Sequence, residues 1–107
     1  MTTNARKKKA TVPLPVDWQG KANDLKAIAD PYRLQIIALL SADDELTCNE
    51  IMYGLQRITQ PTVSHHLSYL VEAGVIIREK RGVFSFFTLN EPRLEEIVNG
   101  IEEIQHA

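Results

Sequence analysis

The stretch QPTVSHHLSYLVEAGVI, from Gln60 to Ile76, joins a proline, small hydroxyl residues and two adjacent histidines to an apolar stripe that ends at a glycine. Pro61 fits the first turn of a helix, Thr59 can cap the free amides, and Gly74 can supply a left-handed stop. Between these signals the apolar residues recur at helical spacing, namely Val63, Leu67, Leu70 and Val71. The stretch therefore predicts one amphipathic helix.

The two histidines point to different sides of this helix. At 100° per residue, His65 falls almost opposite the apolar stripe, whereas His66 lies at the edge of the stripe. We expect His66 to be a boundary residue that is satisfied by a nearby carbonyl or carboxylate. His65 is either a solvent-exposed polar residue or a residue that contacts a binding partner.

Two more helices are predicted near the start of the chain. Apolar residues recur at helical spacing from Trp18 to Ala29. Asp30 and Pro31 then end this helix and start the next one, PYRLQIIALLS, because Asp30 can cap free amides and Pro31 needs no amide hydrogen in a first turn. The second helix is apolar on most sides, so we expect it to be central.

A third helix opens immediately before the helix that carries the histidines. Thr47 and Glu50 form the Thr-x-x-Glu pattern of a capping box, and this helix runs to about Leu55. Only QRIT, residues 56–59, separates the two helices, which is typical of a helix-turn-helix motif.

After Gly74 the period of the pattern changes. VIIREKRGVFSFFTL, residues 75–89, consists of two β-rich runs around Lys80-Arg81-Gly82 and predicts a β-hairpin. Asn90 then starts a last helix whose apolar face carries Leu94, Ile97, Val98, Ile101 and Ile104. The sequence predicts a mainly α fold with a small β-hairpin, a winged helix-turn-helix in the order α-α-α-α-β-β-α.

Length and composition limit the number of domains and the classes of protein that fit this chain. The 107 residues make one domain, which we place at residues 17–107, and residues 1–16 are expected to be a flexible basic N-terminal arm. The arm either solubilises the chain or touches phosphates. No apolar run spans a bilayer and no apolar block follows the basic stretch, so we expect a soluble, cytoplasmic protein.

Charge is segregated along the chain, although the net charge is only −2. Basic residues open it and cluster again late, at Arg78, Lys80 and Arg81, while the last helix is acidic. Local basic patches, rather than the net charge of the whole chain, decide whether a protein binds nucleic acid. In a helix-turn-helix, the first part of the second helix enters the major groove, and Gln60, Thr62, Ser64 and His65 lie there with side chains that can serve base edges.

Catalysis has no supporting set of residues. Adjacent histidines on a helix diverge by about 100° and cannot share a metal ion. Cys48, the only cysteine, has no orienting acid or oxyanion site that would make it a nucleophile beside a histidine. We therefore predict that the protein is not an enzyme.

Four segments resemble, in order, the core of the ArsR/SmtB family of bacterial winged-helix repressors: LKAIADPYRLQIIALL, TCNEI, TQPTVSHHLSYLVEAGVI and REKRGVFSFFTLN. The resemblance implies a homodimer, held by the first and last helices, that occupies an operator and releases it when an effector binds. It also implies that Gln60, Thr62, Ser64 and His65 face the groove. The turn MYGLQRIT is about one residue longer than the usual family spacing, so we expect a looser turn.

The resemblance gives roles to two further groups of residues. Lys80 and Arg81 match the wing tip beside the phosphates or the minor groove, and Arg33 matches a basic residue that touches the DNA backbone or pairs with an acid. The expected dimerisation residues are Trp18, Leu25, Leu94, Ile97, Val98 and Ile101, for which an ordinary core stripe is the alternative.

The effector is not fixed by the sequence. Family members that bind metal near TCNEI carry a Cys-x-Cys, but Cys48 stands alone, and a lone cysteine after a cap is more often a small buried apolar residue. In the last helix, Arg93 replaces the histidine of the other familiar site. Glu102 and His106, duplicated in a dimer, are candidates for nickel or zinc, and a frayed acidic helix end is the alternative. No cofactor is firmly predicted.

A second function stays open beside operator binding by a homodimer. The chain can instead be a winged-helix interaction module or co-regulator that depends on a separate sensor protein, bound through the acidic last helix. Dependence of affinity on salt distinguishes a DNA interface from an apolar protein interface.

Overall fold

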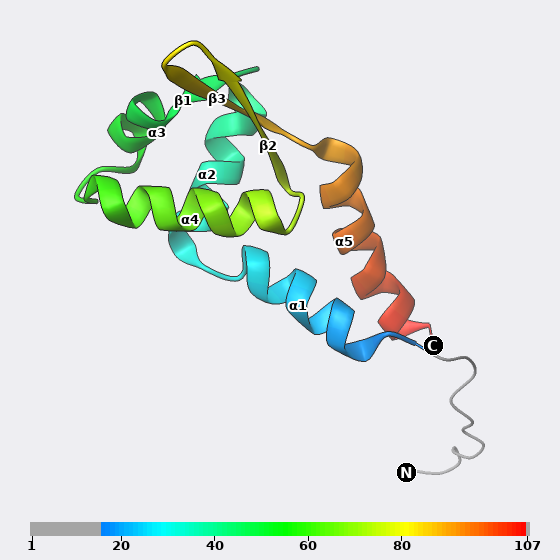
Figure 1. The fold of residues 1–107 in the computed structure, drawn as a ribbon. Helices are drawn as coiled ribbons and strands as arrows, with labels where there is room; N and C mark the ends of the chain where they lie inside the picture. The colour runs from blue at the N-terminus through cyan, green and yellow to red at the C-terminus, as the bar shows by residue number, and fades with distance from the viewer. Residues whose placement is uncertain (1–15, 107) are drawn as a thin grey trace, which may run out of the picture.

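The computed structural model describes residues 16–106, so the predicted arm lies almost entirely outside the described residues. Figure 1 shows the chain as a layer of helices with a small sheet at one end. The elements are α1 (Trp18–Ile28), α2 (Pro31–Ala42), β1 (Leu46–Thr47), α3 (Cys48–Leu55), α4 (Gln60–Glu72), β2 (Ile76–Arg81), β3 (Phe84–Leu89) and α5 (Glu91–Gln105). The predicted winged helix-turn-helix is confirmed, with one additional short strand, β1.

Two of the side-chain caps that we predicted are present, and a third is not. The Asp30 carboxylate accepts hydrogen bonds from the backbone N–H groups of Tyr32 and Arg33, at 2.9 and 3.1 Å. Thr47 and Glu50 form the predicted capping box at the start of α3. Thr59 precedes α4 as predicted, but its hydroxyl lies 2.9 Å from that of Thr62 and does not cap the helix.

The sheet has the order β1-β3-β2, with antiparallel pairs throughout. Arg81 pairs with Phe84, so the hairpin turn consists of Gly82 and Val83, and Gly82 has a φ of +63°. The predicted centre of the turn at Lys80-Arg81-Gly82 is therefore wrong by about one residue: Lys80 and Arg81 belong to β2. The cause is that glycine is the first residue of this two-residue turn, where a positive φ is needed.

One core joins the helices to the wing. Val63, Leu67 and Leu70 of α4 are buried and Val71 is half-buried, which confirms the predicted stripe. Gly74 has a φ of +80° just after α4, as expected of a left-handed stop. The stripe packs with Ile36, Leu40, Ile51, Leu55, Val75, Ile76, Phe87 and Ile97.

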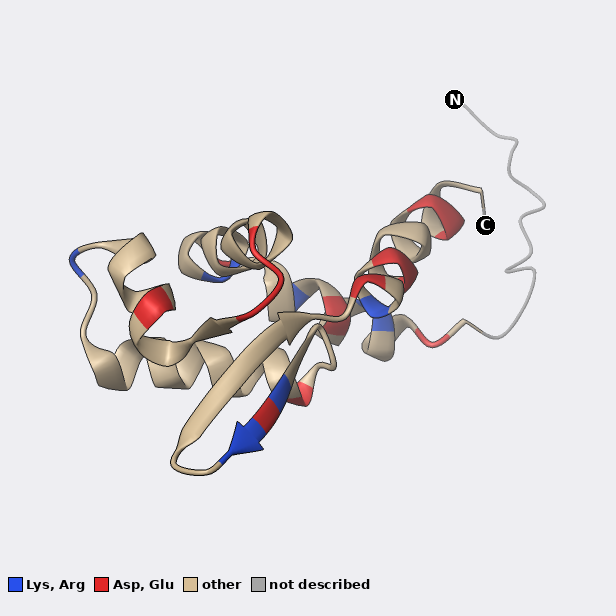
Figure 2. Ribbon diagram, turned by 90° about the horizontal axis from the view of Figure 1, so that it is seen from above, with Lys and Arg blue, Asp and Glu red and all other residues tan. Residues whose placement is uncertain are grey.

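Two ends of the molecule differ in character. α1 and α5 pack side by side at one end of the molecule, while α3 and the wing lie at the other end (Figure 1). Viewed from above, acidic residues gather on α5 and basic ones on β2 (Figure 2). None of the helices in residues 16–106 combines the length and the apolar character that a membrane span requires.

The turn between α3 and α4 holds an unusual backbone. Gln56 has φ 56° and ψ 145°, and Arg57 has a φ of 52°. Both are left-handed in φ without being glycine, a conformation that costs a residue with a Cβ about 1–3 kcal/mol. Two strained residues thus lie in the turn that we expected to be longer than the family spacing.

Replacing Gln56 with glycine should stabilise the fold. Glycine removes the Cβ clash, and after its own entropic cost we expect a net gain of about 1 kcal/mol in the free energy of unfolding. Urea denaturation of the wild type, Gln56→Gly and Gln56→Ala would measure it, because alanine removes most of the side chain and keeps the strain. Equal stability of the glycine and alanine variants would contradict the strained turn.

Candidate nucleic-acid interface

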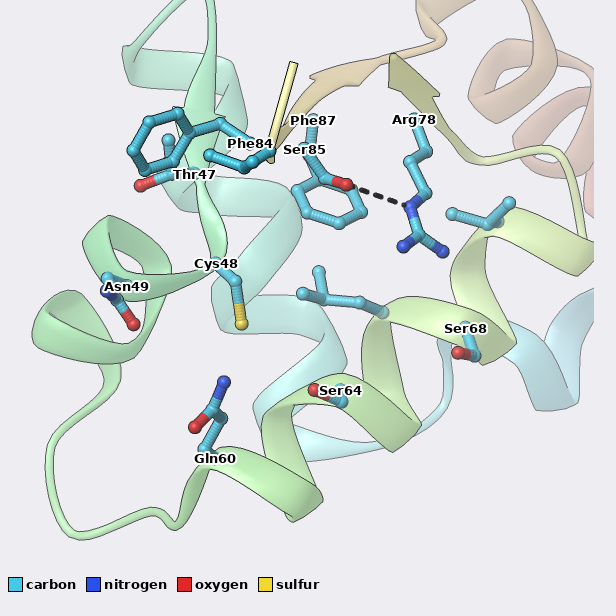
Figure 3. Close-up of a pocket in the computed structure, with 13 residues that line it drawn as sticks. Thr47, Cys48, Asn49, Gln60, Ser64, Ser68, Arg78, Phe84, Ser85 and Phe87 are labelled. Carbon is cyan, nitrogen blue, oxygen red and sulfur yellow. Dashed lines mark hydrogen bonds between the residues drawn. The ribbon is translucent and has the colours of Figure 1, made fainter. Parts of the chain in front are cut away.

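The outer face of α4 is polar because its opposite face fills the core. Gln60, Thr62, Ser64, His65 and Ser68 are all exposed, so the structure leaves each predicted groove-facing residue accessible. Thr62 is held by Thr59, whereas Ser64 and Ser68 line the same pocket as Arg78 and Ser85 of the wing (Figure 3).

A hollow of about 340 Å³ separates α4 from the wing. Its walls come from three places in the chain: the start of α3, the face of α4 and the strands β2 and β3 (Figure 3). The polar lining residues include Asn49, Gln60, Ser64, Ser68, Arg78 and Ser85. An elongated polar partner can therefore contact α4 and the wing together.

Arg78 is the cation of this hollow. Its Nε donates a hydrogen bond to the Ser85 hydroxyl at 3.3 Å, and its two terminal nitrogens point into the hollow (Figure 3). Among residues 16–106 these two nitrogens have no hydrogen-bond acceptor. Ser85 thus orients a guanidinium whose other donors remain available to an anion.

Arg81, predicted at the wing tip, is engaged within the wing. Its guanidinium forms ion pairs with Glu45 and Glu79 and lies 3.9 Å from the centre of the Phe86 ring. The hydrogen bond to Glu45 raises the pKa of Arg81 above its ordinary value. Because its charge is matched by these carboxylates, Arg81 is a weaker candidate for phosphate contact than Arg78.

Strand alternation explains why these arginines differ. Successive side chains of a strand point to opposite faces of the sheet, so Arg78 and Lys80 share the face of buried Ile76. That face meets α4, whereas Glu79 and Arg81 lie on the other face. Counting in steps of two from Ile76 would have identified Arg78, which our choice of Lys80 and Arg81 left out.

Comparison with known proteins identifies the family of this chain. A profile described as a helix-turn-helix domain matches residues 28–79. The transcriptional repressor SdpR of Bacillus subtilis is 38% identical over 77 residues, covering 72% of this chain and 83% of SdpR. The arsenical resistance operon repressor of Staphylococcus xylosus is 32% identical over 80 residues, covering 75% of each chain.

A solved structure of an ArsR family transcriptional regulator superposes with a TM-score of 0.74, covering 87% of this chain and 94% of that one, and its 19% identity supports the fold alone. The chain belongs to the ArsR/SmtB family of winged-helix transcriptional repressors. The predicted family and the predicted class, a DNA-binding transcriptional repressor, are confirmed.

One predicted DNA contact of this ArsR/SmtB protein has an internal role instead. Arg33 is only 9% exposed, and its Nε and Nη2 donate to the carbonyls of Ala27 and Lys26 at 2.7 and 3.0 Å. Its Nη1 lies 3.1 Å from Nδ1 of His66, and the guanidinium stacks 4.3 Å from the centre of the Tyr69 ring. The prediction that Arg33 reaches DNA or an acid is therefore corrected.

His66 is a buried boundary residue, as expected, with 8% of its surface exposed. The expected carboxylate is Asp30, whose Oδ2 lies 3.8 Å from Nε2 of His66, but the closer partner is Arg33. Burial raises the pKa of Asp30, yet backbone hydrogen bonds from Arg33 and Tyr32 and the nearby charges outweigh it and leave that pKa lowered.

The candidate metal ligands do not meet in one protomer. Within residues 16–106, no three His, Cys, Asp or Glu side chains lie close enough to hold a metal ion. Cys48 is half-buried at the hollow, while Glu102 and His106 lie at the far end of α5 (Figure 1). Arg93 of α5 instead binds Asp24 at 2.7 Å and the Ala73 carbonyl at 3.0 Å.

The predicted dimerisation residues divide into two sets. Ile97 is 3% exposed and belongs to the core of the protomer, whereas Leu25 and Leu94 are half-buried and pack against that core. These three residues fit the alternative, an ordinary core stripe. Trp18, Val98 and Ile101 stay 48%, 49% and 40% exposed.

Loss of the Arg33 guanidinium should destabilise the fold. In Arg33→Met, two carbonyls and His66 Nδ1 lose their buried donor, so we expect the free energy of unfolding to fall by about 2–4 kcal/mol. Urea denaturation would measure this loss. Arg57→Met is the matched control at an exposed position and should change stability by less than about 0.5 kcal/mol. Similar losses in both variants would count against a special role for Arg33.

Proposed function

We propose that a homodimer of this chain represses transcription by binding a double-stranded operator, with α4 in the major groove and the wing against the adjacent backbone. The observation that carries the proposal is the hollow between α4 and the wing, where an oriented Arg78 faces the polar side of α4. The negatively charged backbone of DNA is complementary to a polar hollow that holds a cation. We propose no catalytic activity.

The two walls of the hollow suit different parts of DNA. Gln60, Ser64 and His65 on α4 can donate to or accept from base edges, so we assign them sequence recognition. Arg78 and Lys80 on the wing carry positive charge on the face toward α4, so we assign them phosphate contacts. The overall negative charge of the chain does not oppose this, because α5 carries an acidic cluster away from the wing and Glu45 and Glu79 at the wing are paired with Arg81 (Figure 2).

Dimerisation is supported by the apolar residues that α1 and α5 leave uncovered. Trp18, Val98, Ile101 and Ile104 are large apolar side chains exposed at the same end of the molecule. A two-fold axis there would place two α4 helices on the same side of a duplex, and half-sites about 34 Å apart would match them.

The signal that releases the operator is assigned to a site that two protomers share. Within residues 16–106, Glu102 and His106 form no complete site in one protomer, so nickel or zinc binding would need both copies. The alternative is a separate sensor protein. With such a sensor, specific operator binding should not change on adding metal. If the chain is only an interaction module, its own DNA affinity should be weak and independent of sequence.

The test is a titration of the purified protein with its promoter DNA at two salt concentrations, repeated with nickel, zinc or a chelator. We expect sequence-specific binding whose affinity falls steeply with salt, because phosphate contacts release counterions. A change on adding metal would establish a metal effector. Binding that is equal for promoter and scrambled DNA would refute the proposal and favour the interaction module.

The two wing arginines should respond differently to substitution. In Arg78→Ala each protomer loses one phosphate contact, so the slope of log affinity against log salt should become shallower by about two per dimer. Arg81→Ala is the matched control and should change that slope by less than half as much, because Glu45 and Glu79 already match its charge. Fluorescence anisotropy at several salt concentrations would measure both. A larger effect of Arg81 would reverse our assignment.

A charge on the exposed face of α5 should separate the dimer. Ile101→Glu places a carboxylate on the apolar face, so we expect the dissociation constant of the dimer to rise at least tenfold, about 1.4 kcal/mol. Asn99→Glu adds the same charge on the opposite side of α5 and should leave the dimer intact. Analytical ultracentrifugation would measure both, and a dimeric Ile101→Glu would place the interface elsewhere.

A further inference from the structure

The contact between Arg33 and His66 fixes the chemical state of the histidine. An arginine side chain can only donate hydrogen bonds, so the atom facing Nη1 of Arg33 at 3.1 Å must be an acceptor. Nδ1 of His66 therefore carries a lone pair, and the ring is neutral with its proton on Nε2. That N–H faces the Asp30 carboxylate, 3.8 Å away, which favours the same tautomer.

A second proton on His66 would oppose this arrangement. It would place an N–H group on Nδ1 against the N–H groups of Arg33, and two positive charges would then lie side by side. The groups around the ring are Arg33 of α2, Asp30 before α2, and His65 on α4 itself, with the ring of Tyr32 5.7 Å away. Burial first, and then Arg33 and His65, lower the pKa of His66, while Asp30 acts in the opposite direction.

The Arg33 guanidinium links two parts of the proposed repressor. On one side it binds the carbonyls of Lys26 and Ala27 at the end of α1. On the other side it binds His66 and stacks on Tyr69, both on α4. The position of α4, the helix proposed to enter the major groove, relative to α1 and α2 thus depends on the Arg33–His66 hydrogen bond. This hydrogen bond exists only while His66 is neutral.

We propose that His66 is a positioning residue for DNA binding: as a neutral acceptor it ties α4 to Arg33, and the operator-bound state requires it unprotonated. This inference rests on the proposed function. His66 faces inward and does not touch DNA, whereas its neighbour His65 is exposed and is assigned to the groove.

The sign of the pH dependence follows from linkage. If the bound state excludes the proton, binding requires its release, so affinity is unaffected well above the pKa of His66 and falls as the pH drops through that pKa. One proton per protomer limits the loss to about tenfold per pH unit for each His66, and therefore to about a hundredfold per pH unit for the dimer. Because this pKa lies below the ordinary value of 6.5, the loss begins on the acid side of pH 6.5.

A pair of substitutions of similar size tests the acceptor. His66→Asn keeps an acceptor near the position of Nδ1 and cannot titrate, whereas His66→Leu has nearly the same shape as asparagine and no acceptor. At about pH 7.5 we expect His66→Asn to bind the operator within about threefold of the wild type and His66→Leu at least tenfold more weakly. Circular dichroism at each pH would restrict the comparison to folded protein.

The pH profile separates positioning from mere packing. Between about pH 7.5 and 5, the ratio of wild-type to His66→Asn dissociation constants should rise, and other titrating groups cancel in that ratio. His106→Asn, at the far end of α5, is the matched control and should keep the acid-dependent loss when a chelator is present. Parallel profiles for the wild type and His66→Asn, or wild-type affinity for His66→Leu, would overturn the proposal.

Nitrogen NMR of the histidines gives a readout that needs no DNA. The chain has only three histidines, so ¹⁵N-labelled imidazoles can be assigned with the variants above. At about pH 7.5 we expect Nδ1 of His66 to resonate as an unprotonated nitrogen, and a protonated Nδ1 would overturn the proposal. Failure of operator binding in every protein, with this tautomer present, would refute the proposed function separately.

Discussion

The buried guanidinium of Arg33 is the contact on which the placement of the recognition helix depends. The apolar stripe of α4 attaches the helix to the core, but apolar contacts are not directional and permit small rotations. Hydrogen bonds from one rigid, planar group to the end of α1 and to His66 restrict that freedom. Arg93 makes similar bonds at the other end of α4, to the Ala73 carbonyl and to Asp24 of α1.

The wing shows that ion pairs within the fold decide which cations a partner can reach. Three basic residues lie on β2, but Arg81 is matched by Glu45 and Glu79 while Arg78 is held only by a neutral hydroxyl. Net charge contains none of this information. Within residues 16–106, the distribution of pairs leaves Arg78 and Lys80 as a basic face toward α4, although the formal charge of the chain is −2.

Local signals were sufficient for most of the fold. Asp30-Pro31, the capping box at Thr47 and the stop at Gly74 each act within one turn of helix, so sequence alone predicted the positions of these helix ends. β1 was missed because its two residues are ordered by pairing with β3, a contact between segments far apart in the chain. The same limit applies to Arg33, whose partners on α1 and α4 come together only in the folded chain, and to Ile97, which α1 covers.

The small strand β1 has a consequence for the thermodynamics of association. A two-stranded hairpin alone is marginally stable in water, but pairing of Leu46 and Thr47 with β3 makes the base of the wing part of a three-stranded sheet. The base is thus ordered before any partner arrives, and only the tip at Gly82 and Val83 extends beyond the strand pairs. When the wing binds a partner, conformational entropy is therefore lost at only a few residues. The backbone at Arg78 becomes rigid when the protein folds and not when the partner binds.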